Sequence, residues 1–126
     1  MGAMDDSRVL LHIISREHWL GARSAGEIRP DSLADVGFVH LSTARQVHLP
    51  ANRLFFGRKD MVLLLLDPER LDAPVVWEPG VPQDPDSMRF PHLYGPVPTA
   101  AVTDVVDYLP DASGMFTAPP DLKEVR

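Results

Sequence analysis

Three histidines stand where an imidazole could do chemistry, each among apolar or aromatic neighbours. His12 lies in a Leu-Leu-His-Ile-Ile-Ser run, His40 in Gly-Phe-Val-His-Leu-Ser-Thr and His92 in Phe-Pro-His-Leu-Tyr-Gly-Pro. Histidine titrates nearest neutral pH and can donate, accept or bind a metal. An unpaired buried polar group costs roughly 1–3 kcal/mol, so each ring needs a partner or a ligand. The three placements predict one shared cleft, against the alternative that each ring is a hydrogen-bonded core residue.

Short apolar runs predict the strands that would hold these rings. The run ending at Ile14 and the run from Met61 to Leu66 are continuously aliphatic, which is typical of strands covered on both faces. The strand around His40 is short and precedes a Ser-Thr pair. The predicted strands are Arg8–Ile14, Phe38–Leu41, Met61–Asp67, Val75–Glu78 and Ala101–Tyr108, with a turn over Asp67–Leu71.

Capping and breaking residues delimit the helices between these strands. Ser15 is a good N-cap, and Gly26 can stop the helix that follows it. Ser42 or Thr43 is expected to cap a later helix running to Phe56, which Pro50 should break. The predicted helices are Ser15–Ala25, Pro30–Gly37 and Ala51–Phe56. Strands with helices early and between them indicate an α+β fold with a split, twisted, mostly antiparallel sheet.

Prolines set the character of the second half of the chain. Seven of the 13 prolines lie between Pro74 and Pro98, which predicts a structured loop rather than a helix or a central strand. We expect the part from Pro79 onward to form a wall of the cleft, with His92 and Tyr94 pointing toward the other two histidines. The domain is expected over residues 8–108, followed by a mobile or surface-packed tail over 109–126; residues 1–3 are interpreted as a remnant of expression before Met4.

Composition limits the classes of function. A chain of 126 residues with a net charge of −6 is one acidic domain, so general binding to nucleic acid or to an anionic membrane is not expected, although a local RNA end in a pocket stays open. The chain has no cysteine, which removes disulfides and thiolate chemistry and fits a reducing, cytoplasmic location. Its longest apolar run is too short to span a bilayer, and no signal peptide is evident.

Other chemistries have weaker signals. A metal site could be built from His12, His40, His92 and Glu78, but no H-x-H or H-E-x-x-H spacing places two ligands on one element. The G-x-S-x-G elbow, the P-loop and the Rossmann glycine pattern are absent. His18 and His48 lie in helix-like stretches and are interpreted as solvated.

The order of these segments resembles domain-of-unknown-function family 952, a small bacterial family. The resemblance covers roughly residues 8–108, and its most specific part is the heptad Phe90–Pro96. Its other parts are the strand with His12, the helix with Trp19, Gly37–Thr43, Ala51–Phe55, the Leu-rich strand before Asp67-Pro68, and Val76–Glu78. This family in turn resembles the ADP-ribosyltransferase superfamily, near the RNA 2′-phosphotransferases, whose members bind NAD in the cleft of a split sheet.

The resemblance implies roles for individual residues. His12 matches the first signature residue, which holds a ribose, and His40 matches the second, which lies against the nicotinamide. The third signature residue is a glutamate in enzymes that modify proteins, and the chain has no clear equivalent; Phe90–Tyr94 falls in that region. This departure favours the phosphotransferase-like branch, or a protein that binds a nucleotide without ADP-ribosylating proteins.

The leading expectation is therefore a protein that binds NAD or ADP-ribose and either transfers ADP-ribose or cleaves the nicotinamide bond. NAD is the implied cofactor, and a nucleotide-type small molecule is the implied partner. His40 and Tyr94 are expected at the leaving group and His92 in acid–base work. The residues expected to bind NAD are His12, Ser15, Ser42, Thr43 and Arg53. Two alternatives stay open: a non-catalytic nucleotide or small-ligand binding module, and a histidine-dependent metalloenzyme. The oligomeric state, the acceptor and the pathway are not indicated.

Overall fold

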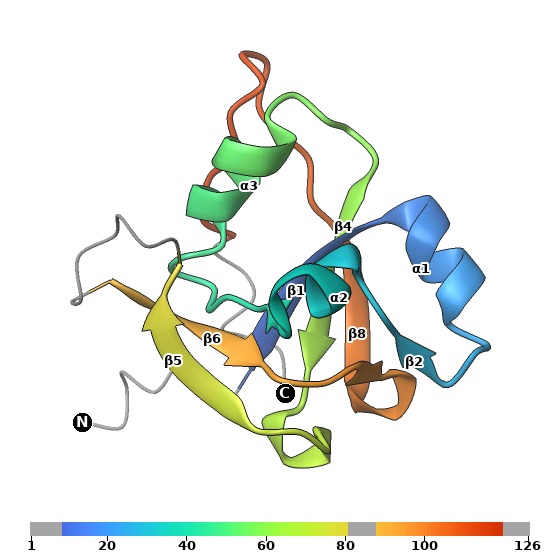
Figure 1. Cartoon of the computed structure of the whole chain (residues 1–126). Helices are drawn as coiled ribbons and strands as arrows, with labels where there is room; N and C mark the ends of the chain where they lie inside the picture. Colours follow the sequence, from blue (N-terminus) through green and yellow to red (C-terminus); the bar gives the residue numbers. More distant parts are fainter. Residues whose placement is uncertain (1–8, 81–87, 120–126) are drawn as a thin grey trace.

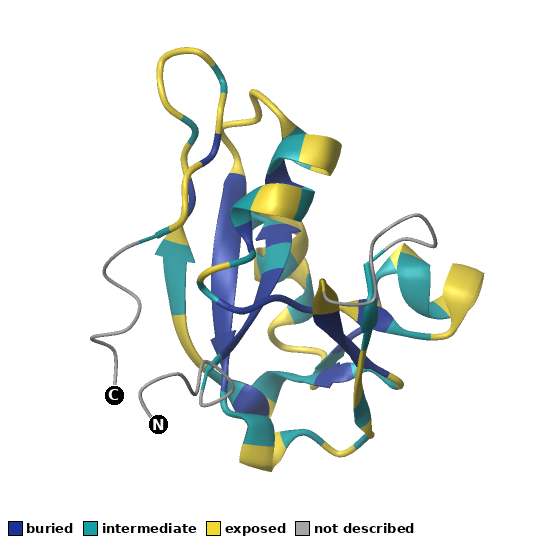
Figure 2. Cartoon of the chain, turned by 90° about the vertical axis from the view of Figure 1, so that its left-hand side faces the viewer, coloured by how far each residue is buried: buried dark blue, intermediate teal, exposed yellow. Residues whose placement is uncertain are grey.

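The aliphatic run Met61–Leu66 forms β4, the central strand of the main sheet, and all six of its residues are buried. In the computed structural model, which describes residues 9–80 and 88–119, β4 lies between β1 (Leu10–Ser15) and β8 (Val102–Asp107) and is antiparallel to both. Leu64 and its even-numbered neighbours pack into one apolar cluster, and Leu63 and Leu65 into a second. The central strand is therefore covered on both faces, as its sequence predicts (Figures 1 and 2).

A second antiparallel sheet carries the other two histidines. It consists of β3 (Val39–His40), β6 (Arg89–Leu93) and β5 (Val75–Pro79), in that spatial order. Ser42, two residues beyond the end of β3, joins this sheet to the first: Leu11 and Ser42 exchange two backbone hydrogen bonds of 2.8 and 2.9 Å. This bridge brings the backbone beside His12 against the backbone beyond His40. A third, two-stranded sheet pairs β2 (Glu27–Ile28) with β7 (Val97–Pro98).

The prediction that no central strand occurs between Pro74 and Pro98 is wrong. Residues 89–93 form β6, the middle strand of its sheet, and Pro91 lies inside it. The carbonyl of Pro91 accepts from the Leu41 amide, so its missing N–H faces the same neighbour, at the point where β3 has ended. The proline is thus tolerated because its missing N–H would point only to Leu41, one residue beyond β3, so a single hydrogen bond at the end of this pairing is lost.

In the described residues three α-helices connect the strands. Ser15 caps α1 (Arg16–Ala22) by accepting from the His18 amide at 3.1 Å, as expected, but the helix ends three residues earlier than predicted. The chain then enters the unpredicted strand β2, whose two residues are too few to show a period. The helix α2 (Asp31–Val36) begins after Pro30 and ends at Gly37, whose φ of 90° suits glycine.

The expected break at Pro50 does not occur. The helix α3 (His48–Phe55) runs through it without interruption. Pro50 is the third residue of this helix, within the first turn, where a backbone N–H has no intrahelical acceptor and its loss costs nothing. Two 3₁₀ turns, η3 (Pro68–Arg70) and η4 (Thr99–Ala101), complete the described elements, and η3 replaces the turn predicted after β4.

The segment after β8 packs against α3 (Figure 1). Phe116 is buried against Tyr108, with 4.8 Å between ring centroids. Asn52 holds it there by accepting from the Phe116 amide at 2.7 Å and donating to the Phe116 carbonyl at 2.9 Å. The first part of the predicted tail, up to residue 119, therefore lies on the domain, and residues 120–126 lie outside the described part.

The substitution Asn52→Ala is expected to lower the free energy of unfolding by about 1–3 kcal/mol, because it removes both hydrogen bonds to the Phe116 backbone. Urea unfolding monitored by circular dichroism would measure this loss. Lys59→Ala, at an exposed position, serves as the control and should stay within about 0.5 kcal/mol of the parent. Equal stability of the two variants would show that Asn52 does not secure the segment.

None of the helices in the described ranges is both long enough and apolar enough to cross a membrane.

Candidate functional site

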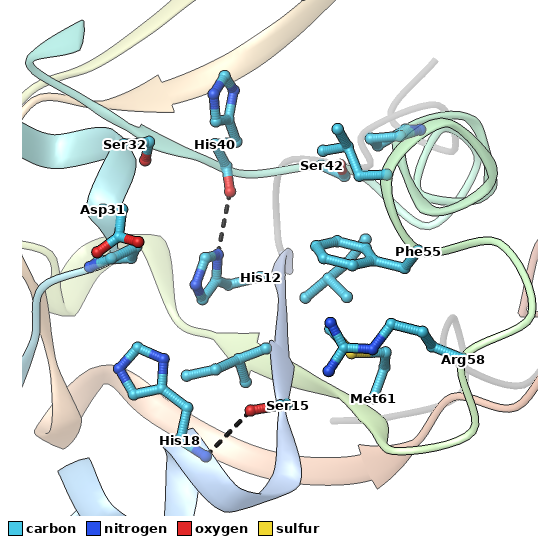
Figure 3. A pocket seen from close by; sticks show the side chains of 15 residues that line it. His12, Ser15, His18, Asp31, Ser32, His40, Ser42, Phe55, Arg58 and Met61 are labelled. Atoms are coloured by element: carbon cyan, nitrogen blue, oxygen red, sulfur yellow. Dashed lines mark hydrogen bonds between the residues drawn. The ribbon is translucent and has the colours of Figure 1, made fainter. Parts of the chain in front are cut away.

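His12 and His40 are joined by a hydrogen bond from a side chain to the backbone. Nδ1 of the buried His12 lies 3.1 Å from the carbonyl oxygen of His40 (Figure 3). A carbonyl oxygen only accepts, so Nδ1 must carry the proton. The antiparallel bridge between the neighbouring residues sets this geometry, since it brings β1 and the end of β3 side by side.

The environment of His12 keeps its ring neutral. Burial lowers the pKa of His12 from 6.5 to about 4, opposed by the hydrogen bond to His40 and assisted by the nearby His18 and His40 rings. At pH 7 the ring therefore carries one proton, on Nδ1, and Nε2 has a free lone pair. A group that binds at Nε2 must be a hydrogen-bond donor, such as a hydroxyl or an amide N–H.

His12 lines the larger of two neighbouring cavities, whose volume is about 400 Å³. Its wall mixes hydroxyl, imidazole and apolar side chains from β1, α2, α3 and the start of β4 (Figure 3). The polar residues that line it are His12, Ser15, His18, Asp31, Ser32, His40, Ser42 and Arg58. The apolar side includes Leu54, Phe55 and Met61. A volume of this size and a wall of this composition are typical of small-molecule sites.

His40 also belongs to a cluster of aromatic rings. Phe38 stacks on His92 with 4.0 Å between centroids and an interplanar angle of 12°. His40 meets His92 edge-on at 5.4 Å, and Phe38 lies 5.2 Å from Tyr94. The pairing of β3 with β6 produces the cluster, because His40 and His92 are register partners. Burial, and then the charges of His92 and Arg53, lower the pKa of His40.

Glu78 on β5 holds the far side of this cluster. Its carboxylate accepts from Nδ1 of His92 at 2.7 Å and from the Tyr94 hydroxyl at 2.8 Å. These hydrogen bonds, the one from His92 first, lower the pKa of Glu78, whereas the same carboxylate raises the pKa of Tyr94. His92 itself is 2% exposed, and its Nε2 has no hydrogen-bond partner among the described residues.

A smaller cavity of about 190 Å³ adjoins the larger one. Both are lined by His40, Ser42, Pro50 and Leu54, so these four residues form the boundary between them. His92, Arg53, Leu41, Phe90 and Gly80 complete the smaller cavity. Within the described part of the chain, Arg53 forms no ion pair or hydrogen bond, which leaves its guanidinium available on the cavity wall.

The structure brings together most of the residues singled out from the sequence, in two places. His12, Ser15, His40 and Ser42 line the larger cavity, while Arg53 and His92 join His40 and Ser42 at the smaller one. Two others line neither. Thr43 is buried and donates to Gln46 at 3.2 Å, and Tyr94 is exposed and binds Glu78.

Several site residues were missed by sequence reasoning. His18, interpreted as merely solvated, lines the larger cavity with Asp31, Ser32 and Arg58. His48, interpreted in the same way, has a buried Nδ1 without a partner in the described structure. Phe38 comes directly before β3 and stacks on His92. The sequence signal for this role was that Phe38 lies in the same Gly-Phe-Val-His motif as His40. Nothing in the spacing of the others pointed to this cavity.

The four-residue metal site considered from the sequence is not assembled. Within residues 9–80 and 88–119, no three His, Cys, Asp or Glu side chains are placed to hold one metal ion. His12 uses Nδ1 on a backbone carbonyl, and Glu78 is engaged by His92 and Tyr94. These four residues therefore do not form a metal centre in the described structure.

Comparison with known proteins identifies relatives of the whole domain. The crystal structure of protein CC0527 from Caulobacter crescentus has 34% sequence identity and a TM-score of 0.71, covering 86% of this chain and 93% of that one. A crystal structure of its double mutant gives 33% identity and the same TM-score, and its solution NMR structure gives 32% identity and a TM-score of 0.70, covering 94% of this chain and 97% of that one. No curated protein matches the chain.

The sequence model of the family described as "Protein of unknown function (DUF952)" matches residues 13–105, from β1 to β8. The matched range includes β3, β5 and β6 and with them the ring cluster, although it begins one residue after His12. The chain therefore belongs to the DUF952 family.

Proposed function

We propose that the larger cavity binds NAD or a related ADP-ribose nucleotide, and that the chain transfers ADP-ribose or cleaves the nicotinamide bond. The observation that carries the proposal is the state of His12. Its neutral ring lines the cavity with Nδ1 bound to the His40 carbonyl, so Nε2 can only accept. A ribose hydroxyl is a donor of the kind that such a nitrogen requires.

The remaining wall is suited to the other parts of a dinucleotide. Phe55 and Leu54 offer an apolar surface for a flat heterocycle, and Arg58 supplies a cation for a phosphate group. Arg58 is already paired with Asp60, so a phosphate would have to compete with that exposed ion pair, which is worth little in water. The cavity of about 400 Å³ can enclose part of a dinucleotide, with the remainder extending into solvent.

The resemblance to the ADP-ribosyltransferase superfamily supports the reaction class and an ADP-ribosyltransferase-like arrangement of the split sheet. His12 and His40 match its first two signature positions, and they are hydrogen-bonded neighbours at one cavity. In this proposal His12 orients a ribose, and the neutral ring of His40 lies beside the departing nicotinamide. Their contribution is positional and electrostatic, because a fixed polar site stabilises the charge that develops on the ribose.

NAD or ADP-ribose is expected to raise the melting temperature of the protein, because a ligand that binds only the folded state stabilises it by mass action. At a concentration 100 times the dissociation constant the stabilisation is about 2.7 kcal/mol. A thermal-shift panel with NAD, ADP-ribose, zinc and nickel would measure it. Stabilisation by a metal alone, abolished by a chelator, would contradict the proposal.

Turnover separates the enzyme from a binding module. Release of free nicotinamide from NAD, followed by chromatography, would identify the enzyme. Stabilisation by NAD without release would favour the second candidate, a nucleotide-binding module, which the absence of a signature glutamate from the described residues of the cavity wall also fits.

A further inference from the structure

We propose that the smaller cavity is the acceptor subsite, that Glu78 and Tyr94 position His92 there as the proton acceptor, and that the subsite takes a hydroxyl group on a small anionic molecule. This inference rests on the proposed function, since it names the group that would receive ADP-ribose. It gives Glu78 and Tyr94 the role of positioning His92, and it gives Arg53 the role of binding the anionic group of the acceptor.

The hydrogen bonds of Glu78 fix which nitrogen of His92 is protonated. An ionised carboxylate only accepts, so Nδ1 at 2.7 Å from Oε1 carries a proton. The Tyr94 hydroxyl donates to both oxygens of the same carboxylate, at 2.8 and 3.0 Å, and so holds it in place. In the neutral ring the lone pair is then on Nε2. A carboxylate that orients an imidazole and stabilises its protonated form is the arrangement that makes histidine a general base.

One face of the His92 ring and its Nε2 edge are left uncovered by Phe38 and Glu78. Phe38 covers one face of the ring at 4.0 Å and Glu78 holds the Nδ1 edge, and neither of these residues lines the smaller cavity. The part of the ring that does line it is therefore the other face or the edge that carries Nε2. That nitrogen is enclosed and lacks a partner in the described structure, a state that is unfavourable unless a ligand relieves it.

The charge of the cavity indicates what the acceptor carries besides its hydroxyl. Arg53 lines the wall without an ion pair among the described residues, in a chain whose net charge is −6. Among the described residues no carboxylate lines this cavity, so an anion there meets the guanidinium of Arg53. Phosphate and carboxylate are both matched by the planar fork of arginine. A volume of about 190 Å³ restricts the bound part to a few heavy atoms.

The proposed step balances as a substitution at the ribosyl carbon of NAD. The acceptor hydroxyl oxygen forms a bond to that carbon, and the bond from the carbon to the nicotinamide nitrogen breaks with its electron pair leaving on nicotinamide. The hydroxyl proton passes to Nε2 of His92, and Glu78 stabilises the resulting imidazolium. No oxidant or reductant is needed.

Binding to the subsite can be tested without NAD. Protein labelled with ¹⁵N-histidine would be titrated with glycerol 3-phosphate, glycerate and glycerol, with His92 assigned through His92→Gln. We expect both anions, and not glycerol at the same concentrations, to shift the His92 ring signals. Arg53→Gln should weaken binding of the anions about tenfold or more, as loss of a charged hydrogen bond implies. Arg23→Gln, an exposed arginine that lines neither cavity, should change it less than about twofold. A response to only one of the two anions would show whether the acceptor carries a phosphate or a carboxylate.

The same spectra test the positioning role. In the wild type the neutral His92 ring should carry its proton on Nδ1 and leave Nε2 bare. Glu78→Leu should give a mixture of tautomers, and Glu78→Gln, whose amide oxygen can still accept, should restore the Nδ1–H form. With NAD added, mass spectrometry should detect an ADP-ribosyl adduct of the acceptor, and Glu78→Gln should form it at least about tenfold more slowly.

The two proposals fail separately. Titrations in which neither anion shifts His92, or a wild-type His92 protonated on Nε2 alone, would overturn the subsite whatever NAD does. Anion binding that depends on Arg53, in a protein that neither binds nor cleaves NAD, would leave the anion site standing and overturn the proposed function together with the transfer step. Cleavage of NAD to free ADP-ribose with no adduct at saturating anion would show that water is the acceptor, and would overturn the assignment of the hydroxyl compound.

Discussion

Replacing His12 by asparagine is expected to abolish the stabilisation by NAD or ADP-ribose while leaving the free energy of unfolding within about 1 kcal/mol of the wild type. The asparagine amide can still donate to the His40 carbonyl in place of Nδ1, but it has no acceptor at the position of Nε2. His12→Ala should lose the ligand response as well, and in addition about 1–3 kcal/mol, because the carbonyl of His40 loses its donor.

Urea unfolding with and without saturating NAD would measure both effects. His40→Ala completes the comparison: the side chain of His40 is exposed and only its backbone carbonyl holds His12, so this variant should lose ligand binding at little cost in stability. Arg23→Gln, at an exposed position that lines neither cavity, is the control and should keep the full nucleotide response. If His12→Asn retained the full nucleotide response, His12 would be a core residue rather than part of the binding site.

The burial of His12 should also make the protein lose stability in mild acid. Its pKa is about 4 in the folded protein and 6.5 in the unfolded chain, so between these values the unfolded state binds more protons. Stability is therefore fully present above pH 6.5, is lost as the pH falls toward 4, and loses no more below that. The difference between the two pKa values corresponds to about 3 kcal/mol.

Urea unfolding at several pH values between 7.5 and 4 would show this loss, and the difference between wild type and His12→Asn would isolate it. Carboxylates titrate in both proteins and cancel in the difference, whereas asparagine does not titrate. We expect the wild type to lose about 3 kcal/mol more than the variant over this range. Parallel curves for the two proteins would mean that folding does not lower the pKa of His12.

The sequence alone was sufficient where short-range chemistry decides the structure. The aliphatic run Met61–Leu66 reads as a strand covered on both faces because no polar residue interrupts it, and β4 has that position. Ser15 and Gly37 delimit helices because a hydroxyl can cap a backbone N–H and because glycine adopts positive φ without strain. These are properties of a few adjacent residues, and they are visible without knowing what packs on them.

Proline showed how a local rule depends on its surroundings. The same rule that forbids proline inside a strand or helix failed at Pro91 and Pro50. The missing N–H of Pro50 falls in the first turn of α3, where no intrahelical acceptor exists, and that of Pro91 falls at the end of the β3–β6 pairing, where only one hydrogen bond is lost. Whether an acceptor is present follows from strand pairing and from where the helix begins, and neither is encoded in the proline itself.

What the histidines can do was decided by the tertiary structure. The sequence singled out His12, His40 and His92 by their residue type and their apolar neighbours. The proton on Nδ1 of His12, its low pKa, and the carboxylate of Glu78 on His92 all follow from strand pairing between segments distant in the sequence. Register determines which side chains meet, and burial determines their charge, because both depend on groups that only folding brings within a few ångströms.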